Sequence, residues 1–168
     1  MNTEQNIKGL EYIRKIREYL SYVETHLKYV YYAFQNLTDA CKDTWWVKDI
    51  EIWNTLHKDI LNHDISKFSK EEFIPYVEHF YPIDGKKPGS IDSAWSHHKN
   101  NNSHHYESLK TDIDVVHMVI DWTAMGYMFG DNAQEYYERN KNKIKLNSRQ
   151  KQIVTEMFVC ISEYNNRR

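Results

Sequence analysis

The stretch "LNHDISKFSKEEF", from Leu61 to Phe73, places a histidine directly before an aspartate. An imidazole nitrogen and a carboxylate oxygen together suit Zn, Mn and Fe and, with more oxygen ligands, Mg. His63 and Asp64 are therefore a candidate metal-binding pair at the end of a predicted helix. The alternative is local, with Asp64 only capping the turn that follows. The dipeptide alone does not decide between these two interpretations.

The residues after this pair add a cation and a helix start. Lys67 would offset negative charge on a phosphoryl group if phosphate binds here. Its alternative role is that of a solvated lysine in a turn. Ser69 and Glu72 have the spacing of a capping box, in which both side chains satisfy N–H groups at a helix start. We therefore expect a helix with Ser69 as its N-cap, which leaves Glu72 without a chemical role.

Two further residues lie on predicted helices where a metal ligand could point inward. His26 is at the border of the apolar face of the first helix, and its alternative is a histidine at the edge of the core, hydrogen-bonded to a tyrosine. Asp121 lies in "HMVIDWTAM", where burial of a carboxylate without a partner would be costly. A metal ion, or a paired histidine or arginine, would remove that cost. His117 is either an accessory ligand or, as we prefer, a residue that orients another ligand.

Four histidines lie within nine residues of one another: His97, His98, His104 and His105. This density favours metal or phosphate binding over a solvated polar loop with some aromatic packing, which is the alternative. His98 shares the apolar face of a short predicted helix, so it is the inward candidate of its pair. For the second pair the sequence leaves the choice open.

The elements that must position these residues are predicted to be helices. Apolar residues recur in alternating steps of four and three over roughly residues 4–37, which predicts one long helix. Further helices are expected from Thr44 to the His-Asp pair, from Ser69, from Ser90 to His98, from a Thr111–Asp114 capping box to Gly130, from an Asp131 cap and near the end of the chain. "YPIDGKKPGS" is the clear loop. Because no stretch alternates with period two, the predicted fold class is all-α.

Composition limits the type of protein further. A chain of 168 residues with 40% hydrophobic and 14% aromatic residues is expected to form one ordered domain, residues 1–168. A net charge of −2 argues against a nucleic-acid partner. Two cysteines, Cys41 and Cys160, fit free thiols in a reducing cytoplasm. The N-terminus has no apolar signal core, and no run approaches the roughly 20 apolar residues of a membrane span, so we expect a cytoplasmic protein without a membrane partner.

The order His26, His63-Asp64, the histidines of 97–105, then Asp121 resembles the HD superfamily of metal-dependent phosphohydrolases. "HDISK" is similar to its His-Asp-x-x-Lys form, in which the lysine lies near a substrate phosphate. The resemblance implies a single-domain helical bundle whose central pocket holds one or two divalent ions. The blocks "HDISKFSKEEFIPYVEHFY", "AWSHHKNNNSHH" and "DWTAMG" also resemble a small family of phage and bacterial HD-like proteins, over about residues 20–145.

The resemblance implies a set of metal ligands: His26, His63, Asp64, His98, His104, His105 and Asp121. The ion or ions would be Mn, Mg, Fe, Zn, Co or Ni. The interval from His98 to His105 is shorter than in the superfamily, which leaves the number of ions open. Asp64 and Lys67 are the predicted catalytic residues of a phosphomonoesterase or phosphodiesterase.

The expected substrate is a small phosphorylated molecule, with a nucleotide as the candidate. A base could stack on one of four aromatic residues, although each is also a candidate core residue: Trp45, Trp46, Trp95 and Tyr106. A phage-encoded chain would act in the host cytoplasm. A homodimer through the apolar row of the first helix is also expected, and burial of that row in a core explains it equally well.

Two other functions use the same residues. Some HD-like proteins are diiron oxygenases, and a histidine-rich site with two carboxylates would also accept iron. The third alternative is that the protein is not an enzyme. It would then bind and sequester a nucleotide, or serve as a helical interaction module with a structural ion.

Overall fold

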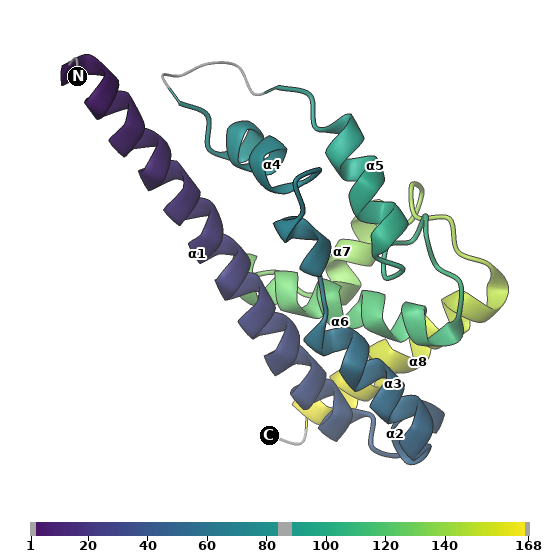
Figure 1. Cartoon of the computed structure of the whole chain (residues 1–168). Helices are drawn as coiled ribbons and strands as arrows, with labels where there is room; N and C mark the ends of the chain where they lie inside the picture. Colours follow the sequence, from purple (N-terminus) through teal and green to yellow (C-terminus); the bar gives the residue numbers. More distant parts are fainter. Residues whose placement is uncertain (1–2, 84–88, 167–168) are drawn as a thin grey trace. The chain divides into compact units, whose positions relative to one another are not determined.

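The computed structural model describes residues 3–83 and 89–166, and over these ranges the fold is all-α, as predicted (Figure 1). The helices are α1 (Thr3–Ala40), α2 (Trp45–Lys48), α3 (Ile50–Leu61), the 3-10 helix η1 (Ile65–Phe68), α4 (Phe73–Phe80), α5 (Asp92–Asn101), α6 (Asp112–Phe129), α7 (Ala133–Asn140) and α8 (Ser148–Asn165). No strand occurs among the described residues. Part of the predicted loop "YPIDGKKPGS", residues 84–88, lies outside them.

The chain divides into two compact units, each made of two separate segments. The first unit consists of Met1–Thr25 and Asp64–Asn101, and the second of His26–His63 and Asn102–Arg168. Helix α1 therefore contributes its first part to one unit and its second part to the other. The single domain expected from the sequence stays a prediction.

The second unit is built around α6, whose apolar residues leave no surface exposed over most of its length. Val115, Val116, Met118, Val119 and Ile120 are each 0% exposed. A helix that is apolar on nearly every side must be covered on every side, and α1, α3 and α8 supply the buried side chains that pack with it. The buried helix predicted from "VVHMVIDWTAMGYMF" is confirmed.

The first unit is held by a smaller aromatic core. Tyr19 of α1 is 1% exposed, and its ring lies 5.5 Å from that of Phe73 and 6.5 Å from that of Tyr76 on α4. Val77 and Ala94 are buried in the same unit. Burial, together with nearby Tyr76 and the acidic side chains of the unit, raises the pKa of the Tyr19 phenol.

Helix caps show which local predictions hold. The capping box of α6 is confirmed, because Thr111 accepts from the N–H of Asp114 and the Asp114 carboxylate accepts from the N–H of Thr111. The capping box at Ser69 is wrong. Helix α4 begins at Phe73 with Glu72 as its N-cap residue, and Glu72 makes no side-chain cap hydrogen bond. Its carboxylate is instead hydrogen-bonded to histidines of α5, described below.

Two other boundaries differ from the sequence prediction. The helix expected from Thr44 is interrupted at Asp49, whose carboxylate accepts from the N–H groups of Glu51 and Ile52 and so starts α3 separately. Helix α7 is capped by Asn132 rather than Asp131, because the Asn132 side chain accepts from the N–H of Glu135.

The structure shows the state of the two cysteines and whether any described helix could cross a membrane. Cys41 and Cys160 are both free thiols, as predicted. Burial, and to a lesser extent the neighbouring Cys160 thiol, raises the pKa of the Cys41 thiol. Among the described residues, none of the helices combines the length and apolar character needed to cross a membrane.

The end of α6 depends on two glycines. Gly130 has a φ of 74°, a left-handed conformation that glycine adopts without steric penalty, and its N–H bonds to the carbonyl of Gly126. A Cβ at Gly126 would lie 2.6 Å from the backbone carbonyl oxygen of Asp131. The close return of the chain therefore requires a residue without a side chain at this position.

We predict that Gly126→Ala destabilises the protein by about 1–3 kcal/mol, because the added methyl group meets backbone that cannot rotate away. Gly9→Ala is the matched control, since a Cβ there has nothing within 4 Å. That control should stabilise α1 by up to about 1 kcal/mol, the helix-propensity difference between the two residues. Urea unfolding measures both changes; equal effects of the two variants would contradict this account of the turn.

Candidate metal centre

Three side chains of the second unit meet in a buried cluster. His26 comes from α1, His63 from the residues after α3 and Asp121 from the middle of α6. The Nε2 atoms of the two histidines are 3.0 Å apart. The Oδ1 atom of Asp121 lies 3.4 Å from Nε2 of His26 and 3.7 Å from Nε2 of His63. Both imidazoles are 3% exposed, so the cluster is largely shielded from water.

The dimensions of this trio fit a metal ion. Ligand atoms bound at about 2.0–2.2 Å to one ion with tetrahedral or octahedral angles lie about 3.0–3.5 Å from one another. The three separations of 3.0, 3.4 and 3.7 Å are close to that range. Two imidazoles and one carboxylate suit Zn, Mn and Fe. His26, His63 and Asp121 could therefore hold a divalent ion with little movement.

His117 approaches the opposite side of the His63 ring. Its Nε2 atom is 2.9 Å from Nδ1 of His63, and it is itself 5% exposed. A neutral imidazole donates from one nitrogen and accepts at the other. With the proton on Nδ1, His63 donates to His117 and keeps the lone pair of Nε2 for an ion. A hydrogen bond from the second nitrogen is the usual way in which a ligating histidine is oriented.

His104 forms a second group of histidines with His63 and His117. Its ring stacks on that of His63, with centroids 4.3 Å apart and an angle of 28° between planes, and lies 4.6 Å from the ring of His117. His63, His104 and His117 each offer a nitrogen within 4.8 Å of the others. His104 is 3% exposed, whereas His105 is half-buried beside it, so burial distinguishes the members of this pair.

Asp64 begins a separate cluster in the first unit. It is 2% exposed and has a φ of 56°, the one positive φ of a non-glycine residue in the described chain. Such backbone is unfavourable for most residues and is best tolerated by aspartate and asparagine. Lys67 lies on η1, and its Nζ is 2.7 Å from Oδ2 of Asp64. With its side chain 13% exposed, Lys67 is a buried ion-pair partner rather than the solvated turn lysine that was the alternative.

Glu72 is the residue of this cluster that sequence reasoning missed. Its side chain is 0% exposed, with Oε1 2.7 Å from Nδ1 of His97 and Oε2 2.8 Å from Nδ1 of His98. A fully buried carboxylate requires such partners, because desolvation of an unpaired charge is costly. No local pattern identifies these partners, because they lie 25 and 26 residues further along the chain and the Ser69 spacing predicts a helix cap instead.

His98 is held between two carboxylates of the first unit. Its Nδ1 faces Glu72 and its Nε2 lies 3.3 Å from Oδ1 of Asp64. Burial by itself lowers the pKa of His98, but the hydrogen bonds to Asp64 and Glu72 outweigh burial and raise the pKa above its ordinary value. Trp95 stacks on the imidazole with ring centroids 5.6 Å apart. His98 is 2% exposed, as expected of the inward member of its pair.

Within each unit, the predicted site residues form a group. The second unit brings together His26, His63, His104 and Asp121, with His105 beside His104, and the first unit brings together Asp64, Lys67 and His98. His63 and Asp64 are neighbours along the chain. The roles assigned to these residues stay predictions.

The candidate base-stacking aromatics have different surroundings. Trp46 is 1% exposed within the core of the second unit, and Trp45 and Tyr106 are partly buried against that core. Trp95 is 37% exposed. The core interpretation therefore holds for Trp46.

Fold and site define an all-α protein with buried histidine and carboxylate clusters. Residues 15–163 match the model of a family of unknown function, DUF5662, so the chain belongs to that family. The match covers the segments that carry both clusters. Neither the comparison with curated proteins nor that with solved structures gave a match.

We predict that the protein binds one Mn²⁺ or Zn²⁺ at the trio. His63→Ala should abolish binding measured by titration calorimetry, and Asp121→Asn should weaken it because a neutral amide replaces a charged ligand. His117→Gln should weaken binding by about 10–100-fold, the usual effect of removing a residue that orients a ligand.

The matched control for metal binding is His79→Ala, because His79 lies in the first unit and bonds to the carbonyl of Gly89. It should bind the metal as the unmodified protein does. Full affinity in His63→Ala, or an equal loss in His79→Ala, would contradict the assignment.

We also predict that Glu72→Gln lowers the free energy of unfolding by about 2–3 kcal/mol, because the hydrogen bonds of a fully buried carboxylate to the buried His98 and the partly exposed His97 are weakened. The control is Glu71→Gln on the neighbouring exposed residue, which should leave stability nearly unchanged. Chemical denaturation of both variants measures the difference. Equal stability of the two variants would show that Glu72 is not an essential partner of His97 and His98.

Proposed function

We propose that the protein is a metal-dependent phosphohydrolase that acts on a small phosphate ester, with a nucleotide as the candidate substrate. The convergence of His26, His63 and Asp121 carries the proposal. These residues lie far apart in the chain, and their three ligand atoms lie within 3.7 Å of one another. The resemblance of "HDISK" to the HD superfamily supports phosphate ester chemistry over other uses of such a centre.

A bound divalent ion would supply a water molecule of lowered pKa and polarise the phosphoryl group. The protein supplies the orientation of the ligands. His117 holds the His63 ring through Nδ1, so that Nε2 is directed at the same region as Nε2 of His26. Asp121 contributes the negative charge that would compensate the charge of the ion in this buried position.

Lys67 and His98 are the proposed phosphate-binding groups of the first unit. Both are held by Asp64, Lys67 through a 2.7 Å ion pair and His98 at 3.3 Å. A cation kept close to its position before substrate arrives needs little reorganisation when negative charge develops on phosphate. The proposed role of Asp64 as a ligand rests on its adjacency to His63 in the chain and on the HD resemblance.

The test is hydrolysis of a panel of nucleotides and phosphomonoesters by purified protein with Mn²⁺. We expect turnover of at least one compound and none after His63 and Asp64 are both changed to Ala. Lys67→Met should lower kcat/KM by about 100-fold, the usual effect of removing one group that stabilises developing charge. Lys70→Met is the control, because the Lys70 side chain is 91% exposed, and it should retain full activity.

Asp64→Asn adds a variant that keeps the backbone shape, because asparagine also tolerates the left-handed conformation at this position. It should fold with lower stability, because Lys67 and His98 lose a charged partner, and it should lose turnover under conditions in which it is still folded. Turnover that survives the double Ala substitution would overturn the proposal. Stoichiometric iron with oxygen uptake would favour a diiron oxygenase instead, and a bound nucleotide recovered unchanged would favour sequestration.

A further inference from the structure

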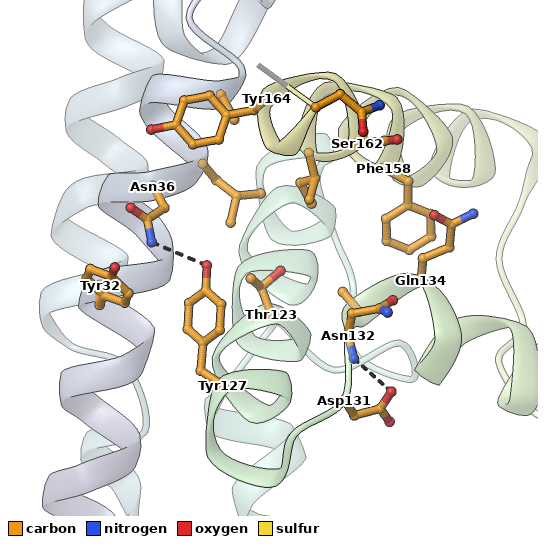
Figure 2. A pocket seen from close by; sticks show the side chains of 15 residues that line it. Tyr32, Asn36, Thr123, Tyr127, Asp131, Asn132, Gln134, Phe158, Ser162 and Tyr164 are labelled. Carbon is orange, nitrogen blue, oxygen red and sulfur yellow. Dashed lines mark hydrogen bonds between the residues drawn. The ribbon is translucent and has the colours of Figure 1, made fainter. Parts of the chain in front are cut away.

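The second unit contains a pocket whose described lining residues include no member of the histidine and carboxylate clusters. It has a volume of about 440 Å³, and α1, α6, α7 and α8 contribute to its walls (Figure 2). This volume is within the range of about 300–1,000 Å³ typical of small-molecule sites. Fifteen described residues line it, all of them in the second unit.

Aromatic rings border this pocket and remain accessible at its edge. Tyr32 is 51% exposed and Tyr127 is 40% exposed, with their ring centroids 5.5 Å apart. Phe158 of α8 is 9% exposed and Leu37 of α1 is 2% exposed, and both line the pocket. Large aromatic groups beside an apolar surface are suited to stacking with a flat ring.

Apart from Asp131, the polar groups of the described lining are uncharged donors and acceptors. Figure 2 shows Asn36 directed at Tyr127, and the Asn36 amide donates to the Tyr127 hydroxyl over 3.3 Å. The Tyr127 O–H can then donate to a ligand. The Thr123 hydroxyl donates to the carbonyl of Val119, which leaves it able to accept. Gln134 and Ser162 add an amide and a hydroxyl to the lining.

The charge of the pocket argues against a phosphorylated ligand. None of the fifteen described lining residues is a lysine, arginine or histidine. The one charged residue among them is Asp131, which is ion-paired with Arg139 and also accepts from the N–H of Asn132. Among these described residues an anion would meet one carboxylate and no cation, whereas an uncharged molecule would bury no charge on entering.

The pocket and the metal centre use different residues of the same helices. Asn36 follows His26 by ten residues along α1, which corresponds to about 15 Å along the helix axis. Thr123 follows Asp121 by two residues along α6, which places the two residues about 200° apart around the helix axis. A ligand in the pocket would therefore contact different side chains from those that hold the proposed ion.

We propose that this pocket binds an uncharged aromatic heterocycle, a purine or pyrimidine nucleoside, at a site separate from the metal centre. The ring stacks against the aromatic border formed by Tyr32 and Tyr127. The Tyr127 hydroxyl, the Thr123 hydroxyl and the Gln134 amide bind its heteroatoms. The proposal does not depend on phosphohydrolase activity.

The test is binding of adenosine, guanosine, cytidine and uridine to the full chain, measured by ligand-observed NMR and by titration calorimetry. We expect saturable one-to-one binding of at least one nucleoside. Its 5′-monophosphate should bind no more tightly, because none of the described lining residues is a cation. Binding should persist in His63→Ala and in the presence of a chelator, which separates this site from the proposed metal centre.

Two variants locate the ligand. Ser162→Trp, at an exposed position of the lining, should weaken binding at least tenfold by filling the pocket without disturbing the core. Thr155→Trp is the matched control, on an exposed position of the same helix that does not line the pocket, and should bind normally. Absence of saturable binding for all four nucleosides, unchanged affinity in Ser162→Trp or loss of binding in His63→Ala would each overturn the proposal.

Discussion

Both ring nitrogens of His63 face other titratable side chains, and the arrangement of the proposed metal centre depends on this. Nδ1 contacts His117 at 2.9 Å and Nε2 contacts His26 at 3.0 Å, while the whole residue is 3% exposed. Three imidazoles and the Asp121 carboxylate are thereby removed from most of the solvent. Since buried polar groups are costly without partners, the helices that carry them must be held in one register.

The second unit meets that requirement with an apolar helix. Val119 and Ile120 before Asp121 and Ala124 after it are each 0% exposed, so α6 is fixed by packing on both sides of this position. Helix α1 presents His26 four residues before Val30, which is buried in the same core. Rigid packing around a polar cluster is what keeps ligand atoms close to a binding geometry before an ion arrives.

In the first unit, buried polar groups are stabilised by partners of complementary charge or hydrogen-bonding character. Asp64 and Glu72 are carboxylates that are 2% and 0% exposed, and Lys67, His97 and His98 supply their partners. Opposite charges at these distances compensate part of the desolvation that burial imposes. The left-handed backbone of Asp64 is the strained point of this arrangement, as is common where a side chain is held for a function.

Sequence reasoning succeeded where local rules or periodicity decide the outcome. The spacing of apolar residues predicted α1 and the buried α6, Gly130 marked the end of α6, and the Thr111 cap was located correctly. The same periodicity identified His98 as the buried member of its pair. Each of these features depends on residues close together in the chain.

Sequence reasoning failed where a distant partner competes with a local one. Glu72 has the spacing of a helix-capping residue relative to Ser69, but its carboxylate pairs with His97 and His98, which lie 25 and 26 residues further along the chain. Both carboxylate oxygens of Glu72 are bonded to imidazoles of α5, and the side chain makes no cap hydrogen bond at the start of α4. The spacing of residues cannot reveal such a choice. The contacts of His63 with His26 and His117 also join residues that are distant in the chain, so the sequence did not predict them.

The most direct test of the central claim is a crystal structure of the protein grown with Mn²⁺, with anomalous diffraction recorded for the metal. The account predicts an anomalous peak within about 2.0–2.3 Å of Nε2 of His26, Nε2 of His63 and a carboxylate oxygen of Asp121. A well-ordered structure with no peak among these three side chains, or with the ion bound by other residues, would contradict it.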